Sequence, residues 1–203
     1  LMFRIINFSR LIKLVVGLTV FFSVAVYALI LHFSPTTSLF KLFSISSAVA
    51  ALLIFLIGSN FTARWIWSVM RVFDGSLFPD INGAWEGEII FEGGQLTARA
   101  VIRQTLSHTQ IDLHTPTSKS ITLESTPVSE SGQPRLYYVH RVTPHNPNWH
   151  IYTGSTLFDV RYVQVNGKKV LELSGHYYTD RKTNGRIRLR QIGHDCSQDV
   201  SYY

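Results

Sequence analysis

The chain of 203 residues has a single cysteine, Cys196, so it cannot form an intramolecular disulfide. This agrees with a reducing compartment such as the cytoplasm. Familiar catalytic signatures are missing too: there is no G-x-S-x-G, no H-E-x-x-H, no phosphate-binding loop and no C-x-x-C. We therefore expect no catalytic residue and no cofactor. His145 and His150 share a loop, but we interpret them as surface histidines and expect no metal site.

Acidic residues are absent from the first 73 positions, which carry six of the 19 Lys and Arg residues. The formal net charge of +6 comes from this end, because the other thirteen basic residues are balanced by the 13 Asp and Glu that follow. Binding of nucleic acid needs a basic surface on the folded domain. The sequence therefore predicts neither a DNA nor an RNA partner.

Charges are also missing from two long apolar runs, 14–31 and 42–63. At about 1.5 Å per residue, a helix over the first run covers most of a hydrocarbon core roughly 30 Å thick. Pro35 ends that helix, and the loop before the second run is short. We predict a hairpin of two transmembrane helices, about 11–33 and 39–60, within a membrane segment 1–73. A cleaved signal peptide is the alternative for the first run, although no clear cleavage site follows it.

Basic residues also predict the orientation of the hairpin. Three precede the first run and two follow the second, whereas the connecting loop has only Lys41. By the positive-inside rule, both termini and the rest of the chain face the cytoplasm from the inner membrane. Trp65 and Trp67 fall where interfacial aromatic residues are common.

Small residues at a spacing of four recur on the second run, as Ser44 with Ala48 and Ser47 with Ala51. Such spacing lets membrane helices approach closely and associate. It is also an ordinary composition for such helices, so self-association remains a hypothesis at this point.

No long helical periodicity appears after Asn82, and short alternating runs take its place. We predict a linker at 74–80 and an all-β domain at 81–203 with eight antiparallel strands, near 83–92, 96–105, 108–114, 119–125, 135–143, 151–164, 169–180 and 186–193. Turns are expected at Gly93–Gly94, Thr115–Pro116, Ser131–Gly132, 144–149, Asn166–Gly167 and Asn184–Gly185. Eight strands fit a small closed, lipocalin-like barrel, and a five-stranded OB-type barrel is the nearest alternative.

Alternation predicts which side chains face the barrel interior. On the first strand these are Trp85, Gly87, Ile89 and Phe91; on the sixth they are Thr156, Phe158, Val160 and Tyr162; on the seventh they are Leu171, Leu173, Gly175, Tyr177 and Thr179. This inward set becomes polar toward one end, which is how a ligand pocket is lined. A solid core remains the alternative, because hydroxyl groups are common at barrel mouths.

Basic residues cluster near the last strand, where Arg186, Arg188 and Arg190 alternate with aliphatic residues. That pattern indicates a solvated outer face. Arg181 follows Tyr177 and Thr179 in parity, so it either lies on the surface or offers a bidentate fork to a phosphate.

Two apolar helices, then the segment 80–87 (DINGAWEG), then a terminal motif at 175–189 form an order that resembles one known family. It is similar to the two-transmembrane β-barrel effectors of CBASS, the bacterial anti-phage systems built on cyclic oligonucleotides. The Gly-x-Trp of the first strand also resembles lipocalin-like barrels, in which an Arg of the last strand packs on the Trp. Arg188 or Arg190 would have that part here.

The resemblance implies a non-enzymatic effector. A partner nucleotidyltransferase makes a cyclic dinucleotide, the cytosolic barrel binds it, and the protein self-assembles and disrupts the inner membrane, which kills the infected cell. Membrane lipid and further copies of the chain are then its other partners. The ligand-binding residues that we predict are Tyr177, Thr179 and Arg181 from the terminal motif and Tyr137, Tyr138 and Thr156 from strand parity.

Two other functions suit the same pattern. A membrane-anchored carrier would use the barrel for a lipid or another apolar ligand, and would have a wholly apolar cavity. A non-enzymatic scaffold would tether a protein partner at the membrane and bind no small molecule.

Overall fold

The computed structural model describes residues 8–33, 39–58, 68–69, 78–105 and 108–202. Contacts between residues divide the chain into two compact units, one that contains Ile6–Gly75 and one that contains Ser76–Tyr203. Three predicted features lie outside the described residues: most of the loop between the helices, the segment with Trp65 and Trp67, and the first half of the 74–80 linker.

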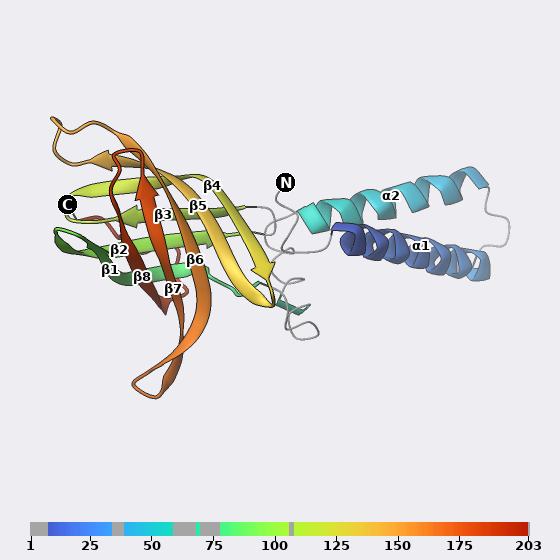
Figure 1. The fold of residues 1–203 in the computed structure, drawn as a ribbon. Coiled ribbons are helices and arrows are strands. Elements are labelled where there is room, and N and C mark those ends of the chain that lie inside the picture. The colour runs from blue at the N-terminus through green and yellow to red at the C-terminus, as the bar shows by residue number, and fades with distance from the viewer. Residues whose placement is uncertain (1–7, 34–38, 59–67, 70–77, 106–107, 203) are drawn as a thin grey trace. The chain divides into compact units, whose positions relative to one another are not determined.

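The N-terminal unit contains two helices, α1 (Phe8–Phe33) and α2 (Leu39–Gly58), which lie side by side and antiparallel (Figure 1). The predicted helical hairpin is confirmed. Large apolar side chains of this pair are exposed, among them Phe21, Phe33 and Phe55. The predicted membrane spans are not confirmed: within the ranges that the structure describes, no helix is both long enough and apolar enough to cross a membrane.

The second unit is a barrel of eight antiparallel strands (Figure 1). Each strand pairs with the next, and β8 pairs with β1, so the sheet closes on itself. The strands are β1 (Gly83–Phe91), β2 (Gly94–Gln104), β3 (Thr109–His114), β4 (Ser118–Glu130), β5 (Gln133–Pro144), β6 (Tyr152–Val165), β7 (Lys168–Thr179) and β8 (Asn184–Gly193). All eight predicted strands are confirmed, and the five-stranded alternative is wrong.

The predicted inner faces are largely confirmed by burial. Trp85, Phe158 and Leu173 are fully buried. Tyr162 is the exception, because its side chain is 44% exposed. It lies on the part of β6 beyond Asp159, which is the last β6 residue paired with β5, and this part forms a two-stranded ribbon with β7. Alternation predicts the face of a strand but not where the barrel wall ends, and this ribbon projects from the barrel (Figure 1).

Two of the four glycine signals lie at the tight turns themselves, and the predicted turn at Gly93–Gly94 lies one residue earlier, because β2 begins at Gly94. Ser131–Gly132 and Asn166–Gly167 both have left-handed backbones, with φ of 51° and 78° in the first and 50° and 75° in the second. The predicted turn at Asn184–Gly185 is wrong, because β8 begins there and the turn lies just before it, with Lys182 at a φ of 62°. Gly185 serves close packing instead: a Cβ atom at this position would lie 2.7 Å from Cε1 of Tyr177 and would also strike the Ile90 carbonyl oxygen.

A buried polar cluster closes the end of the barrel at which the chain enters. The backbone N–H of Ile81 donates to Oε1 of Gln104 at 3.0 Å, and the Gln104 N–H donates to Oδ1 of Asn82 at 2.7 Å. Trp85 Nε1 donates to the Ile81 carbonyl at 3.0 Å. These bonds satisfy the polar groups that burial removes from water, so this end is plugged.

Candidate ligand-binding site

A cavity of about 410 Å³ opens at the opposite end of the barrel. Its wall comes from the strand ends next to the β1–β2, β3–β4, β5–β6 and β7–β8 connections. The volume lies within the roughly 300–1,000 Å³ that is typical of small-molecule sites. Apolar lining side chains include Ile89, Phe91, Leu96, Leu113, Val142 and Ile187. The barrel is therefore hollow at one end. The sequence indicated this, because the inward-facing residues become polar toward one end of the strands.

Three aromatic rings form a column along the inner wall. The rings of Tyr138 and His140 stack at 4.6 Å with an interplanar angle of 20°, and Tyr138 stacks on Phe158 at 6.1 Å and 28°. Tyr138 and His140 are two residues apart on β5 and share its inner face, while Phe158 comes from the neighbouring strand β6. The first two rings line the cavity and Phe158 lies fully buried beside them. Flat faces of this kind are surfaces on which nucleobases stack.

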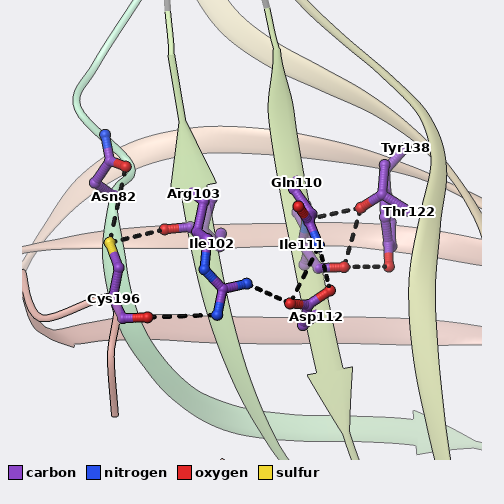
Figure 2. A network of polar contacts seen from close by, with 9 residues as sticks. All are labelled: Asn82, Ile102, Arg103, Gln110, Ile111, Asp112, Thr122, Tyr138 and Cys196. Atoms are coloured by element: carbon purple, nitrogen blue, oxygen red, sulfur yellow. Dashed lines mark hydrogen bonds and ion pairs between the residues drawn. The ribbon is translucent and has the colours of Figure 1, made fainter. Parts of the chain in front are cut away.

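The Tyr138 hydroxyl is held at the seam between β3 and β4. It lies 3.3 Å from Ser120 Oγ. It also lies 3.4 Å from the Ile111 carbonyl oxygen (Figure 2). The backbones of β3 and β4 pair at Leu113–Ser120 and His114–Lys119. Further along, the Thr122 side chain joins the two strands: its Oγ1 accepts a hydrogen bond from the Ile111 N–H at 2.7 Å and donates one to the Ile111 carbonyl oxygen at 3.0 Å. Burial raises the pKa of Tyr138, so this phenol stays protonated near neutral pH.

His140 is the other buried polar group of the column. Its side chain is only 6% exposed, and its Nδ1 has no hydrogen-bond partner among the residues that the structure describes. Gly154 makes room for the ring, since a Cβ atom there would lie 2.7 Å from Nε2 of His140. Desolvation lowers the pKa of His140 from 6.5 to about 4, so the imidazole is neutral at pH 7.

Hydroxyl groups surround the mouth of the cavity. Thr115 Oγ1 lies 3.0 Å from Ser118 Oγ on one side, and Thr179 Oγ1 lies 2.6 Å from Thr183 Oγ1 on another. Tyr152 also lines the mouth, and burial raises its pKa. Each of these groups is neutral and can both donate and accept a hydrogen bond.

Charge enters the site only at its rim. Within the described part of the chain, no lining side chain of the cavity is charged at pH 7. Arg181, on the β7–β8 turn, stacks its guanidinium 4.2 Å from the ring centroid of Tyr152 and donates to the carbonyl of His150. The adjacent Asp180 accepts from the Thr153 N–H at 2.9 Å and from its Oγ1 at 2.8 Å. These contacts join the turn to the start of β6 and place one cation, Arg181, beside the mouth, next to the carboxylate of Asp180 on the same turn.

The predicted ligand residues are distributed unevenly over this site. Tyr138, Tyr177 and Thr179 line the cavity, and Arg181 lies at its rim. Thr156 is buried and pairs in register with Tyr138 and Tyr177, but it is not part of the cavity wall. Tyr137 and Tyr138 cannot both face inward, because neighbours on a strand point to opposite sides.

Tyr137 points outward: its side chain is 42% exposed and its hydroxyl donates to Oε1 of Glu130 at 2.8 Å. His140 and Tyr152 were missed by the sequence analysis. His140 shares parity with Tyr138 on β5, and Tyr152 shares parity with Thr156 on β6. Strand parity was thus the signal that would have found both.

The strand arginines belong to the outer face. Arg161, Arg188 and Arg190 surround Glu172, whose side chain is only 1% exposed, at N–O distances of 2.7, 3.4 and 3.0 Å. Burial alone would raise the pKa of Glu172, but the hydrogen bonds and charges of these arginines together lower it. The expected packing of Arg188 or Arg190 on Trp85 is therefore wrong, because both are engaged outside the barrel.

The two loop histidines do not come together with other ligands. His145 Nδ1 lies 3.1 Å from the Pro116 carbonyl oxygen. Over the described ranges, no group of three or more His, Cys, Asp or Glu side chains is arranged to hold a metal ion. Cys196 is a free thiol whose Sγ lies 3.4 Å from the Ile102 carbonyl oxygen (Figure 2).

A closed barrel with a neutral, aromatic and hydroxyl-lined cavity at one end belongs to the class of small-molecule-binding barrels. The family model described as "Cap15, cyclic dinucleotide receptor domain" matches residues 76–191, and the chain belongs to this family. A relative from Staphylococcus schleiferi, "CD-NTase-associated protein 15", is 30% identical over 139 residues, which cover 63% of this chain and 68% of the relative. The resemblance to CBASS effectors is thereby confirmed, and the matched domain is a receptor domain rather than a catalytic one.

Proposed function

We propose that the barrel binds a cyclic dinucleotide in the cavity at its open end, and that this binding is the signal to which the protein responds. The carrying observation is the column of Tyr138 and His140 beside a ring of hydroxyl groups. A cyclic dinucleotide offers two bases for stacking and two phosphates that accept hydrogen bonds. The match to a cyclic dinucleotide receptor domain supports this choice of ligand. A partner nucleotidyltransferase would supply it.

We also propose that the N-terminal helices act at the inner membrane, with both termini in the cytoplasm. Supporting this are the two uncharged runs, the basic residues that flank them, and the exposed apolar side chains of α1 and α2. Ligand-dependent association of copies, aided by the exposed Ser47, Ala48 and Ala51 of α2, would then concentrate these helices and disrupt the bilayer.

The test of ligand binding is thermal unfolding of the purified full chain with cyclic di-AMP, cyclic di-GMP, cyclic GMP–AMP and cyclic di-UMP. We expect one of them to raise the midpoint in a saturable manner, because a ligand that binds only the folded state stabilises it. No shift with any member of the panel contradicts the proposal. Carbonate extraction of cell membranes tests the second part, since a helical pair embedded in lipid stays in the pellet.

One observation favours a second candidate, the carrier of an apolar ligand. The cavity wall is mostly apolar and, among described residues, carries no formal charge. Such a carrier would retain lipid during purification. Organic extraction followed by mass spectrometry distinguishes the two, because a stoichiometric lipid that cyclic dinucleotides do not displace supports the carrier.

A further inference from the structure

The cavity and its rim differ sharply in charge, and this difference constrains how a ligand lies. The described lining is neutral throughout, whereas Arg181 stands at the mouth beside Tyr152. Moving a phosphate away from water into a neutral cavity is costly unless a cation or several donors replace the water. The phosphates of a nucleotide are therefore favoured at the rim and disfavoured at the floor.

The floor has the opposite preference. The rings of Tyr138 and His140 stack there, with Tyr138 almost fully buried between His140 and Phe158, and His140 carries a buried nitrogen that lacks a partner within the described chain. An unsatisfied buried polar atom is costly, and a ligand that supplies its partner recovers that free energy. A nucleobase provides both a flat face for stacking and an edge with donors and acceptors.

The volume of the cavity also favours a ligand whose bases and phosphates lie in different places. The cavity volume of about 410 Å³ lies in the lower part of the range for drug-sized ligands. A cyclic dinucleotide has two bases, two riboses and two phosphates, so only part of it fits inside. We propose that the ligand enters base-first: one nucleobase lies in the cavity and bonds to His140, while the phosphates stay at the mouth beside Arg181. This orientation rests on the proposed function.

The test compares affinities of the full chain for the cyclic dinucleotide panel, at 50 and 500 mM KCl. For Arg181→Gln, we expect about a tenfold loss at low salt that shrinks at high salt, because an exposed ion pair is screened. For His140→Gln, we expect about a tenfold loss that is the same at both salt concentrations and that differs between adenine and guanine ligands, because a buried hydrogen bond to a base edge is not screened.

Three controls separate binding from folding. Unfolding midpoints identify any variant that is merely unstable. Arg181→Lys keeps the charge but not the planar stack on Tyr152, so it should retain the salt dependence of the wild type. Tyr178→Phe, at a side chain that is exposed on the outer face of β7, should bind like the wild type.

The outcomes distinguish this inference from the function on which it rests. A wild-type chain that binds no member of the panel overturns both. Binding in which His140→Gln weakens all bases equally, or in which the loss in Arg181→Gln ignores salt, overturns the orientation and leaves the receptor function standing. If Arg181→Lys behaves like Arg181→Gln, the role of Arg181 is to stabilise the β7–β8 turn and not to bind phosphate. That result would also overturn the base-first orientation.

Discussion

Acid should destabilise this protein through one buried imidazole, that of His140. In the folded chain desolvation lowers the pKa of His140 to about 4, whereas the unfolded chain has the ordinary value of 6.5. Between these values the unfolded state binds a proton that the folded state does not. The free energy of unfolding therefore falls as the pH falls from 6.5 toward 4, and the contribution of His140 is fully present only above pH 6.5.

The size of this effect follows from the same gap. A difference between 6.5 and about 4 corresponds to about 3 kcal/mol when the pH is below both values. At pH 5 roughly 2 kcal/mol of it is already lost, and at pH 7 almost none. Because the ring is 6% exposed, solvent screening reduces this figure little.

The comparison is urea unfolding of the wild type and His140→Gln at pH 7 and pH 5, followed by fluorescence to which the buried Trp85 contributes. Glutamine keeps a polar side chain but does not titrate. We expect the wild type to lose about 2 kcal/mol more than the variant between the two pH values. His114 and the carboxylates titrate in both proteins, so their effects cancel. Parallel pH profiles would refute the reasoning that His140 is buried and neutral.

Three further substitutions test the barrel itself by urea unfolding. Glu172→Gln should cost about 1–2 kcal/mol, because three half-exposed arginines lose their shared carboxylate, whereas Glu92→Gln, at an exposed position, should cost almost nothing; equal effects would contradict the cluster's role. Gly185→Ala should cost about 1–3 kcal/mol through overlap with the Tyr177 ring, and a neutral result would show that the two do not meet. Gly167→Ala should cost about 1 kcal/mol for its φ of 75° alone, since nothing lies near its Cβ position, and a stabilising effect would exclude that turn.

Much of the barrel could be predicted because its determinants are local. Alternation along a strand and an Asn–Gly turn each act over a few residues, so eight strands and the turn at Asn166–Gly167 were readable. The end of β4 was not, because its pairing with β5 continues through Pro127 to Glu130 and depends on the partner strand. Gly185 misled for another reason: its absent side chain leaves space for the ring of Tyr177, its cross-strand partner on β7.

The site was predictable only in outline. Parity gave the inner face for Tyr177 and Thr179, and the terminal motif pointed to Arg181. The position of a residue along the barrel axis could not be predicted. Alternation does not distinguish a residue that lines the cavity, such as Tyr138, from an inward-facing neighbour that is buried away from it, such as Thr156. The unpaired nitrogen of His140 depends on what every nearby strand offers, and no local pattern carries that information.

The positions of the mouth and the plug constrain how binding is communicated. The chain passes into the barrel at Ile81 and Asn82, which are fixed by Gln104 at the plugged end, whereas the cavity opens at the other end of the strands. The closed sheet of the barrel, in which each strand pairs with its neighbours, lies between the two ends. A ligand held base-first leaves its outer half at the mouth, next to Trp149, which is 52% exposed. Under the proposed function, the bound ligand thus alters the surface of the mouth itself, and it can promote contact between copies without any change in the plugged end.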